Sequence, residues 1–327
     1  VGARWVLEIE SRADTTLPLA PCIQNQGYAM GVAASLASAE NKPLRQIDLK
    51  ALQKHLVEIG SLPESVLTDG DSYPIPKERI EESVKNVVND YQDLPLILAQ
   101  QDVSLPLLRK AYRSAEDIKK QMEDSTRDRL GRTDPGDRRD PKLIYAHILG
   151  MLGDPTGSQA LLDAVLSREW DEGWRFTGMG QFGGSVSPLD SLIIALGRTR
   201  DPRALKIVLD KVEKLSASDA FSHHRAVAMA LETMGDRQAA KPLAELLNKP
   251  EMMGHAFTGI DKARQLTPRG QSTDNTTREK TLRELVLARA LYRCGDYEGL
   301  GKKILREYEN DLRGHLARHA HAVLKVK

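Results

Sequence analysis

The residues best suited to chemistry or recognition gather in the second half of the chain. Ser222-His223-His224-Arg225 joins two imidazoles to a guanidinium, Trp174 stands beside Arg175, and His255 lies in a polar stretch further on. Imidazole titrates near neutral pH, and tryptophan and arginine are enriched where proteins bind one another. The sequence therefore predicts a composite groove for a partner or a catalytic domain, formed by Trp174, Arg175, His223, His224, Arg225 and His255. The alternative is that these loop aromatics pack only against their own loops.

The histidines do not predict a metal centre. His223 and His224 are consecutive, so on a helix capped by Ser222 their side chains point about 100° apart and cannot serve one site. His315 and His319 stand four residues apart on one helix face, and Asp311 is the nearest acidic residue that could complete a metal site. We expect a basic, solvated C-terminal helix there rather than a metal-binding one.

One phosphate-binding pattern, GxGxxG, occurs at residues 178–183. A dinucleotide site needs this pattern after a buried strand and at the start of a helix. Residues 170–177 do not read as such a strand, and the next helix has its own start signals in Ser187 as N-cap and Pro188 in the first turn. We therefore expect a glycine-rich loop packed by Trp170, Trp174 and Phe176, and no nucleotide site.

No complete catalytic set stands out elsewhere. The sequence has no nucleophile elbow around a serine, no Cys–His motif and no paired carboxylates distinct from the solvated charges. Its two cysteines, Cys22 and Cys294, exclude a disulfide framework and a CxxC zinc site. Free thiols are the expected state, with a single bridge between the two as the alternative.

The elements that must position these residues follow a recurring phrase of apolar helix, glycine, aspartate and second helix. Four copies turn near Asp154, Asp201, Asp236 and Asp296, and a weaker one turns near Asp102. The glycine supplies the left-handed residue that stops the first helix, and the aspartate caps the second. Helix pairs with a period of about 35 to 50 residues are typical of HEAT-like solenoids.

Three longer segments interrupt the phrase and are predicted to be loops or linkers. They are residues 124–140, 169–188 and 248–278, which are rich in charge, glycine or polar residues. Inserts in successive repeats gather on one face of a solenoid, so the inserts that carry Trp174 and His255 should lie near each other. The predicted fold is mainly α, with residues 75–327 forming a HEAT-like, right-handed stack of helix pairs.

Composition agrees with this fold class. Of the 327 residues, 40% are hydrophobic, 28% charged and only 5% aromatic, and helix formers abound. The net charge of +1 gives no global electrostatic case for nucleic acid or a membrane surface as partner. No window reaches the ~18 consecutive apolar residues of a membrane-spanning helix.

The segment from Cys22 to Ser61 differs from the repeats. Residues 24–27 form a polar, turn-forming entry, Tyr28 to Ala39 is a run of small residues at helical spacing, and a second amphipathic segment follows Pro43. From Ser11 to Pro74 this layout resembles the C-terminal end of FAD-dependent oxidoreductases of the glutathione-reductase-like class, in the bacterial branch whose catalytic domain is followed by helical repeats. Arg12-Ala13-Asp14 is similar to the Arg-x-Asp that precedes this turn in that family.

The resemblance implies a helix whose N-terminus points at a flavin ring. Its donors would be the backbone N–H groups of Asn25, Gln26, Gly27 and Tyr28, and Gly27 would let the backbone approach the ring. FAD is then expected in the parent protein, and this chain alone is expected to bind no cofactor, since the main nucleotide-binding domain would lie upstream. The alternative is a small-residue helix that packs tightly and touches no ligand.

Two functional interpretations follow. In the first, residues 1–74 end an FAD-dependent oxidoreductase domain, and the repeats of residues 75–327 contact the upstream FAD-binding domain, a substrate or a partner. In the second, the chain is a non-catalytic HEAT-repeat scaffold for protein–protein interaction. The start at Val1 indicates a removed segment or a part of a longer protein, so the compartment is not readable from the sequence.

Overall fold

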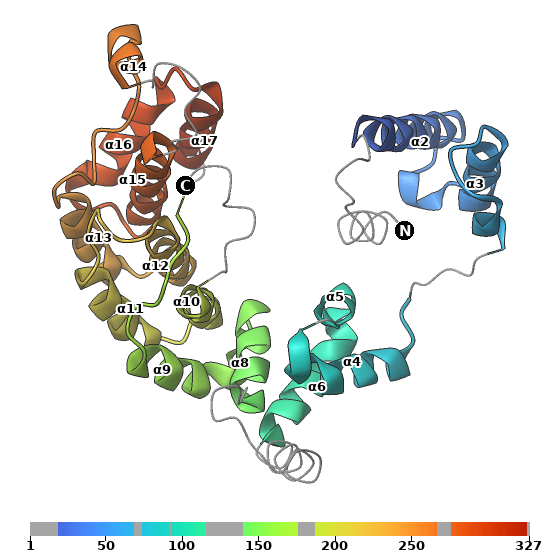
Figure 1. Ribbon diagram of the computed structural model, residues 1–327, viewed down its shortest axis with the longest axis horizontal. Coiled ribbons are helices and arrows are strands. Elements are labelled where there is room, and N and C mark those ends of the chain that lie inside the picture. Colours follow the sequence, from blue (N-terminus) through green and yellow to red (C-terminus); the bar gives the residue numbers. More distant parts are fainter. Residues whose placement is uncertain are drawn as a thin grey trace. The chain divides into compact units, whose positions relative to one another are not determined.

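The computed structural model describes residues 19–68, 74–91, 93–115, 140–175, 187–266 and 276–325. Helices are the only regular elements within these ranges, which confirms the mainly α class for them. None of these helices combines the length and the apolar character that crossing a membrane requires. The chain divides into two compact units, one up to Pro76 and one from Lys77 onward, and Figure 1 labels their helices.

The first unit is a small helical piece. α2 (Leu19–Ala39) packs on α3 (Leu49–Glu58) and on the 3-10 turn η1 (Leu44–Gln46), and a second turn, η2 (Glu64–Leu67), packs on α3. Asp48 caps α3, because its carboxylate accepts the Ala51 N–H at 3.0 Å. The core gathers around Ala33, Leu52 and Leu56. So small a core leaves little margin of stability.

The polar entry predicted at residues 24–27 is wrong. α2 begins at Leu19 and runs through these residues without a break. The backbone N–H groups of Asn25, Gln26, Gly27 and Tyr28 therefore point at the carbonyls one turn earlier, and only the first four N–H groups of a helix lack such partners. The physical reason is that a glycine inside a helix costs only about 1 kcal/mol relative to alanine, which the surrounding helix can offset.

The second unit is a succession of helices, most of them in pairs. An entry group of α4 (Lys77–Asp90), α5 (Leu94–Ala99) and α6 (Gln101–Arg113) comes first. The pairs are α8 (Pro141–Met151) with α9 (Ser158–Ser167), α10 (Pro188–Thr199) with α11 (Ala204–Glu213), α12 (Phe221–Met234) with α13 (Ala240–Leu247), and α15 (Thr276–Arg293) with α16 (Leu300–Glu309). α14 (Ile260–Leu266) precedes the last pair, and α17 (Gly314–Lys325) follows it.

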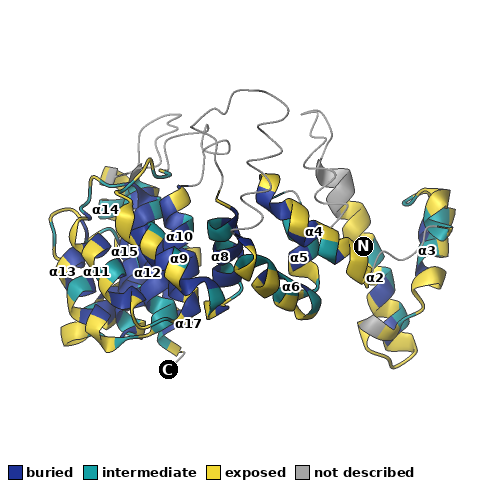
Figure 2. Cartoon of the chain, turned by 90° about the horizontal axis from the view of Figure 1, so that it is seen from below, coloured by how far each residue is buried: buried dark blue, intermediate teal, exposed yellow. Residues whose placement is uncertain are grey.

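These pairs form two rows. The first helices α8, α10, α12 and α15 pack side by side, and the second helices α9, α11 and α13 lie along one side of that row (Figure 1). One continuous core of mostly aliphatic side chains runs between the rows from Ala146 to Val323. Figure 2 shows the buried residues concentrated on α10, α12 and α15. The row of first helices keeps its opposite side partly open to solvent.

Three pairs turn at a glycine in the left-handed conformation. Gly153, Gly235 and Gly295 have φ values of 80°, 65° and 106°. The aspartates that follow the first two, Asp154 and Asp236, accept backbone N–H groups of the next turn at 2.9 and 2.8 Å. The predicted phrase of helix, glycine, aspartate and helix is confirmed at these turns.

The glycine of the second pair has a different use from the one predicted. α10 does not stop at Gly197 but continues to Thr199, and Arg200 takes the left-handed position with φ 55°. A Cβ atom on Gly197 would lie 2.4 Å from Ala230 Cα on the neighbouring first helix. Gly197 therefore allows α10 and α12 to approach closely.

Candidate functional site

Residues 168–175 form a non-helical strap that is anchored at the start of α10. Asp171 accepts a hydrogen bond from the Ser187 hydroxyl and another, at 3.1 Å, from the Leu189 N–H. Ser187 also accepts the Asp190 N–H at 2.9 Å, so its predicted role as the N-cap of α10 is confirmed. One carboxylate thus joins the strap to a helix terminus, where its negative charge is favoured.

The strap continues to the starts of α12 and α15. The Trp174 N–H donates to the Ser222 Oγ at 2.8 Å, and the Arg175 guanidinium lies 3.9 Å from Glu279 in the first turn of α15. The predicted cap role of Ser222 is wrong, because α12 begins at Phe221 and its N-cap is Ala220. The Ser222 hydroxyl instead serves the strap, which links three first helices at one edge.

His223 is a buried partner of the strap. Its side chain is 4% exposed, its Nδ1 lies 2.8 Å from Asp190 Oδ1, and its Nε2 lies 3.1 Å from the Asp171 carbonyl. The Trp170 ring packs against it in a tilted arrangement, at 4.4 Å between centroids. Burial acts to lower the pKa of His223, but the hydrogen bonds and charges of Asp190 and Asp171 outweigh it, so the pKa is raised. Both acceptors favour the doubly protonated, cationic ring.

His224 occupies the opposite kind of environment. It is fully buried, its Nδ1 donates to the Ala220 carbonyl at 3.0 Å, and its Nε2 has no hydrogen-bond partner. Burial lowers the pKa of His224 to about 4, with the charge of Arg283 acting in the same direction. The ring is therefore neutral at physiological pH.

His255 belongs to a second connecting loop, which is held by buried charges of α15. The backbone N–H groups of Gly254 and His255 each donate to Glu284 at 2.8 Å. Arg283, buried beside them, donates to the Ala217 carbonyl at 2.7 Å and to the Glu251 carbonyl at 3.2 Å. Adjacent residues of α15 therefore fasten this loop and the loop before α12.

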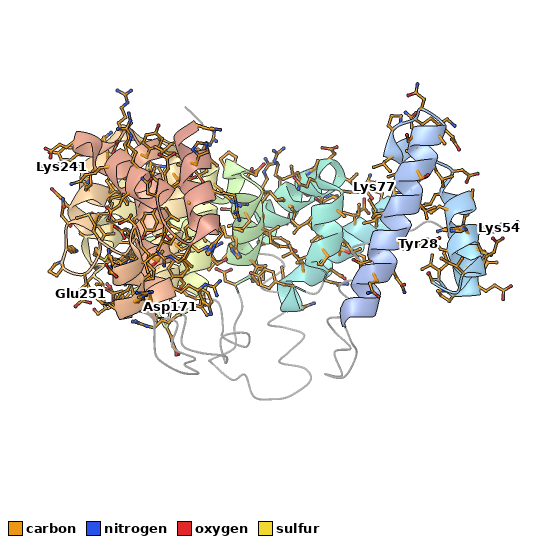
Figure 3. The ribbon with its side chains drawn as sticks, turned by 90° about the horizontal axis from the view of Figure 1, so that it is seen from above. Tyr28, Lys54, Lys77, Asp171, Lys241 and Glu251 are labelled. Carbon is orange, nitrogen blue, oxygen red and sulfur yellow. The ribbon has the colours of Figure 1, made fainter. Side chains whose placement is uncertain are left out.

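The six residues of the predicted groove lie at different depths in the structure. His223 and His224 lie beneath the surface, whereas Trp174 and Arg175 lie on the strap, Arg225 is exposed on α12, and His255 lies half-buried in the second loop. Figure 3 shows Asp171 of the strap and Glu251 of the second loop at one edge of the unit, with Lys241 at the opposite edge. A groove along this edge, lined without the two imidazoles, stays a prediction. The GxGxxG pattern lies outside the described residues.

The first unit carries the four residues predicted to face a flavin. Asn25, Gln26, Gly27 and Tyr28 are all exposed on α2. The Tyr28 hydroxyl lies 2.9 Å from His55 Nε2, and the two rings stack at 6.0 Å between centroids. A Cβ atom on Gly27 would meet nothing within 4 Å. Packing against the described residues therefore does not require glycine at this position.

No group of three or more potential metal ligands occurs within the described ranges. Asp311, considered as a ligand beside His315 and His319, is buried and accepts hydrogen bonds from the Phe257 N–H and from Arg313. The Cys294 thiol is free and buried, and it donates to the Leu231 carbonyl at 3.4 Å.

A pocket of about 470 Å³ opens between α8 and α10. His147 stands in it with Nε2 2.7 Å from Ser191 Oγ and Nδ1 3.5 Å from the Tyr91 hydroxyl. Burial lowers the pKa of His147, so a neutral imidazole faces the pocket. Leu143 and Ile144 supply apolar walls. The arrangement suits an apolar group with one or two hydrogen-bonding atoms better than a charged one.

The pocket adjoins a longer surface on the first-helix row. In each pair, the residues two and six positions before the left-handed turn residue fall on the same side of the first helix, because they are one turn apart. With the exception of Ile194, which is buried, these side chains are exposed or half-buried. This surface, the row face, consists of His147, Met151, Ile194, Arg198, Met229, Thr233, Arg289 and Arg293. Sequence reasoning missed this surface, although the aspartates that directly follow the four turn residues were identified from the sequence.

Comparison with known proteins agrees with the paired helices. Residues 224–249 match the PBS lyase HEAT-like repeat, and this stretch contains most of α12 and all of α13. No curated protein and no solved structure matches the chain. The chain therefore carries a HEAT-like repeat at its third helix pair.

Proposed function

We propose that this chain is a non-catalytic HEAT-like repeat scaffold that binds a protein partner on its row face. The observation that carries the proposal is the coincidence of a HEAT-like match with the α12–α13 pair, whose turn recurs in the other pairs. In this proposal the pairs form a HEAT-like solenoid, in which each pair is stabilised mainly by its neighbours.

The internal chemistry supports a scaffold. Buried ionisable side chains hold connecting loops in place. Asp190 and His223 hold the strap, and Glu284 and Asp311 hold the loop around His255. Connections held in this way present a rigid surface, and rigid surfaces lose less conformational entropy on binding than mobile ones. The row face is the longest series of repeat-equivalent, solvent-accessible positions that we identify.

Site-specific cross-linking tests this function. A photo-reactive amino acid would replace Met229 on the row face of the full chain, and Lys241 on the second helix α13 as the matched control. We expect a covalent adduct with one identifiable host protein from position 229 and none from position 241. Adducts in equal yield from both positions, or none from any row-face position, would refute the scaffold.

The flavoprotein interpretation is the second candidate, and it rests on the resemblance of Ser11–Pro74 to the end of an FAD-dependent oxidoreductase domain. We propose the visible absorption spectrum of the complete reading frame, freed of unbound flavin, as its test. A flavin band that weakens in Gly27→Ala would support a ligand against α2, because nothing within 4 Å obstructs that methyl group in the described structure. A colourless protein that takes up no added FAD would leave the scaffold function as the remaining candidate.

A further inference from the structure

Charge is distributed unequally between the two rows of helices. Each second helix carries at least one acidic side chain that is not buried: Asp163 on α9, Asp210 on α11, Glu245 on α13 and Glu307 on α16. On the described parts of α8, α10, α12, α15 and α17, Glu232 is the single acidic side chain that is not buried. The net charge of +1 for the whole chain conceals this difference.

Basic side chains occupy the row face where the acidic ones are missing. Arg198 and Arg293 stand at equivalent positions, two residues before the left-handed turn residue, and Arg289 is one turn before Arg293. Arg225 is exposed on α12, one turn before Met229, which lies on the row face. Four guanidinium groups from three successive first helices therefore share one side of the row.

Glu232 does not neutralise this surface. It bridges Arg289, at 2.8 Å, and Arg293, so two cations share one carboxylate. Burial, and then the charges of Arg289 and Arg293, lower the pKa of the neighbouring His319 on α17. An anion approaching α15 thus meets a net positive potential.

Apolar side chains alternate with these cations. Met151 and Met229 are half-buried at row-face positions of α8 and α12, and the pocket beside His147 adds apolar walls between α8 and α10. Methionine adapts its shape to different apolar partners, and arginine binds carboxylates in bidentate geometry. A surface with both properties is complementary to a segment that carries carboxylates and apolar side chains together.

We propose that the row face, together with the adjacent Arg225, binds an acidic amphipathic peptide segment of the partner protein. Its carboxylates would bind Arg198, Arg225, Arg289 and Arg293, and its apolar side chains would contact the methionines. This inference rests on the proposed scaffold function and adds the chemical class of the partner. Duplex DNA is a less fitting occupant, because its phosphate backbone makes no use of the methionines between the arginines.

Fluorescence anisotropy with the full chain tests the inference. The probe is a labelled synthetic helix-forming peptide of about 18 residues, or five turns, with glutamates on one face and leucines on the other. We expect Arg225→Glu/Arg293→Glu to weaken its binding by about tenfold or more, since charge reversal converts attraction into repulsion. The matched control Lys241→Glu/Lys302→Glu makes the same charge change on second helices and should alter binding by less than about twofold.

A peptide series keeps the test independent of protein folding. Replacing the glutamates by glutamine should weaken binding by the wild-type chain about tenfold, and 0.5 M salt should weaken the glutamate peptide more than the glutamine peptide. Equal binding of the two peptides would overturn the inference, and so would tighter binding of duplex DNA than of the acidic peptide. A cross-link from position 229 without binding that depends on the peptide's glutamates would refute this inference alone. If neither the cross-link nor such peptide binding is found, the proposed scaffold function is refuted as well.

Discussion

At the scale of single residues, two consecutive histidines have opposite electrostatic environments. Both ring nitrogens of His223 face an oxygen acceptor, which stabilises the cation. The His224 ring is buried without a hydrogen-bond partner for Nε2, which stabilises the neutral form. Their helical positions, about 100° apart, direct one ring to the strap and the other to the interior. The pH dependence of stability should therefore separate them.

His224→Leu should make the free energy of unfolding less sensitive to acid than it is in the wild-type chain. The folded-state pKa of about 4 lies below the unfolded value near 6.5, so this group contributes stability above pH 6.5 that disappears as the pH falls toward 4. The wild-type chain should lose about 2 kcal/mol from this group between pH 7 and pH 5. Urea unfolding of both proteins at the two pH values measures the difference. If the free energy of unfolding depended on pH equally in both proteins, the lowered pKa of His224 would be contradicted.

His223→Gln should show the opposite sign. The folded-state pKa is raised, so the stabilising contribution is complete below the unfolded pKa and is lost as the pH rises through the folded one. His223→Gln should therefore lower the free energy of unfolding by more at about pH 6 than at about pH 9. A cost that grows with pH would show that the Asp190 contact does not favour the cation.

At the scale of elements, close approach of the first helices depends on small residues. Gly197→Ala places a methyl group 2.4 Å from Ala230 Cα, a backbone atom that cannot yield without moving α12. Overpacking of this kind costs about 1–3 kcal/mol, which exceeds the gain of up to about 1 kcal/mol in helix propensity. Thermal unfolding should show a lowered midpoint. The control Gly259→Ala meets nothing within 4 Å and should be neutral or slightly stabilising.

The sequence predicted elements best where the signal is local. The turns at Gly153, Gly235 and Gly295 and the Ser187 cap depend on a few adjacent residues, and they are confirmed. The start of α2 was missed because polar residues and a glycine lower helix propensity without preventing a helix. Gly197 was misread because its close contact with Ala230 joins different repeats.

The candidate site could be predicted only in part, since its contacts span distant segments. The bond from His223 to the Asp171 carbonyl connects residues 52 apart, and Arg283 reaches Ala217 across 66. No local pattern reveals that these side chains are buried. The arginines Arg198 and Arg293, in contrast, each stand three residues before the aspartate that follows the turn, so aligning the repeats on Asp201 and Asp296 would have shown them from sequence.

At the scale of the whole molecule, bulk quantities hide the organisation. A net charge of +1 averages a basic first row with second helices of mixed charge. The two compact units also differ in core size, since the first depends on a few residues around Leu56 while the second has a core that spans its helix pairs. Each unit should therefore respond separately to a core mutation.

Leu56→Ala should unfold the first unit and leave the second intact. Truncating a buried leucine costs about 2–5 kcal/mol, which exceeds what a core as small as that of α2 and α3 can supply. Hydrogen exchange should show lost protection in residues 49–58 and unchanged protection in residues 221–234. Leu231→Ala, in the core of α12, should reverse the pattern. Loss of protection in both segments from either variant would mean that the units unfold as one, and the second unit would then not be a self-supporting stack of helix pairs.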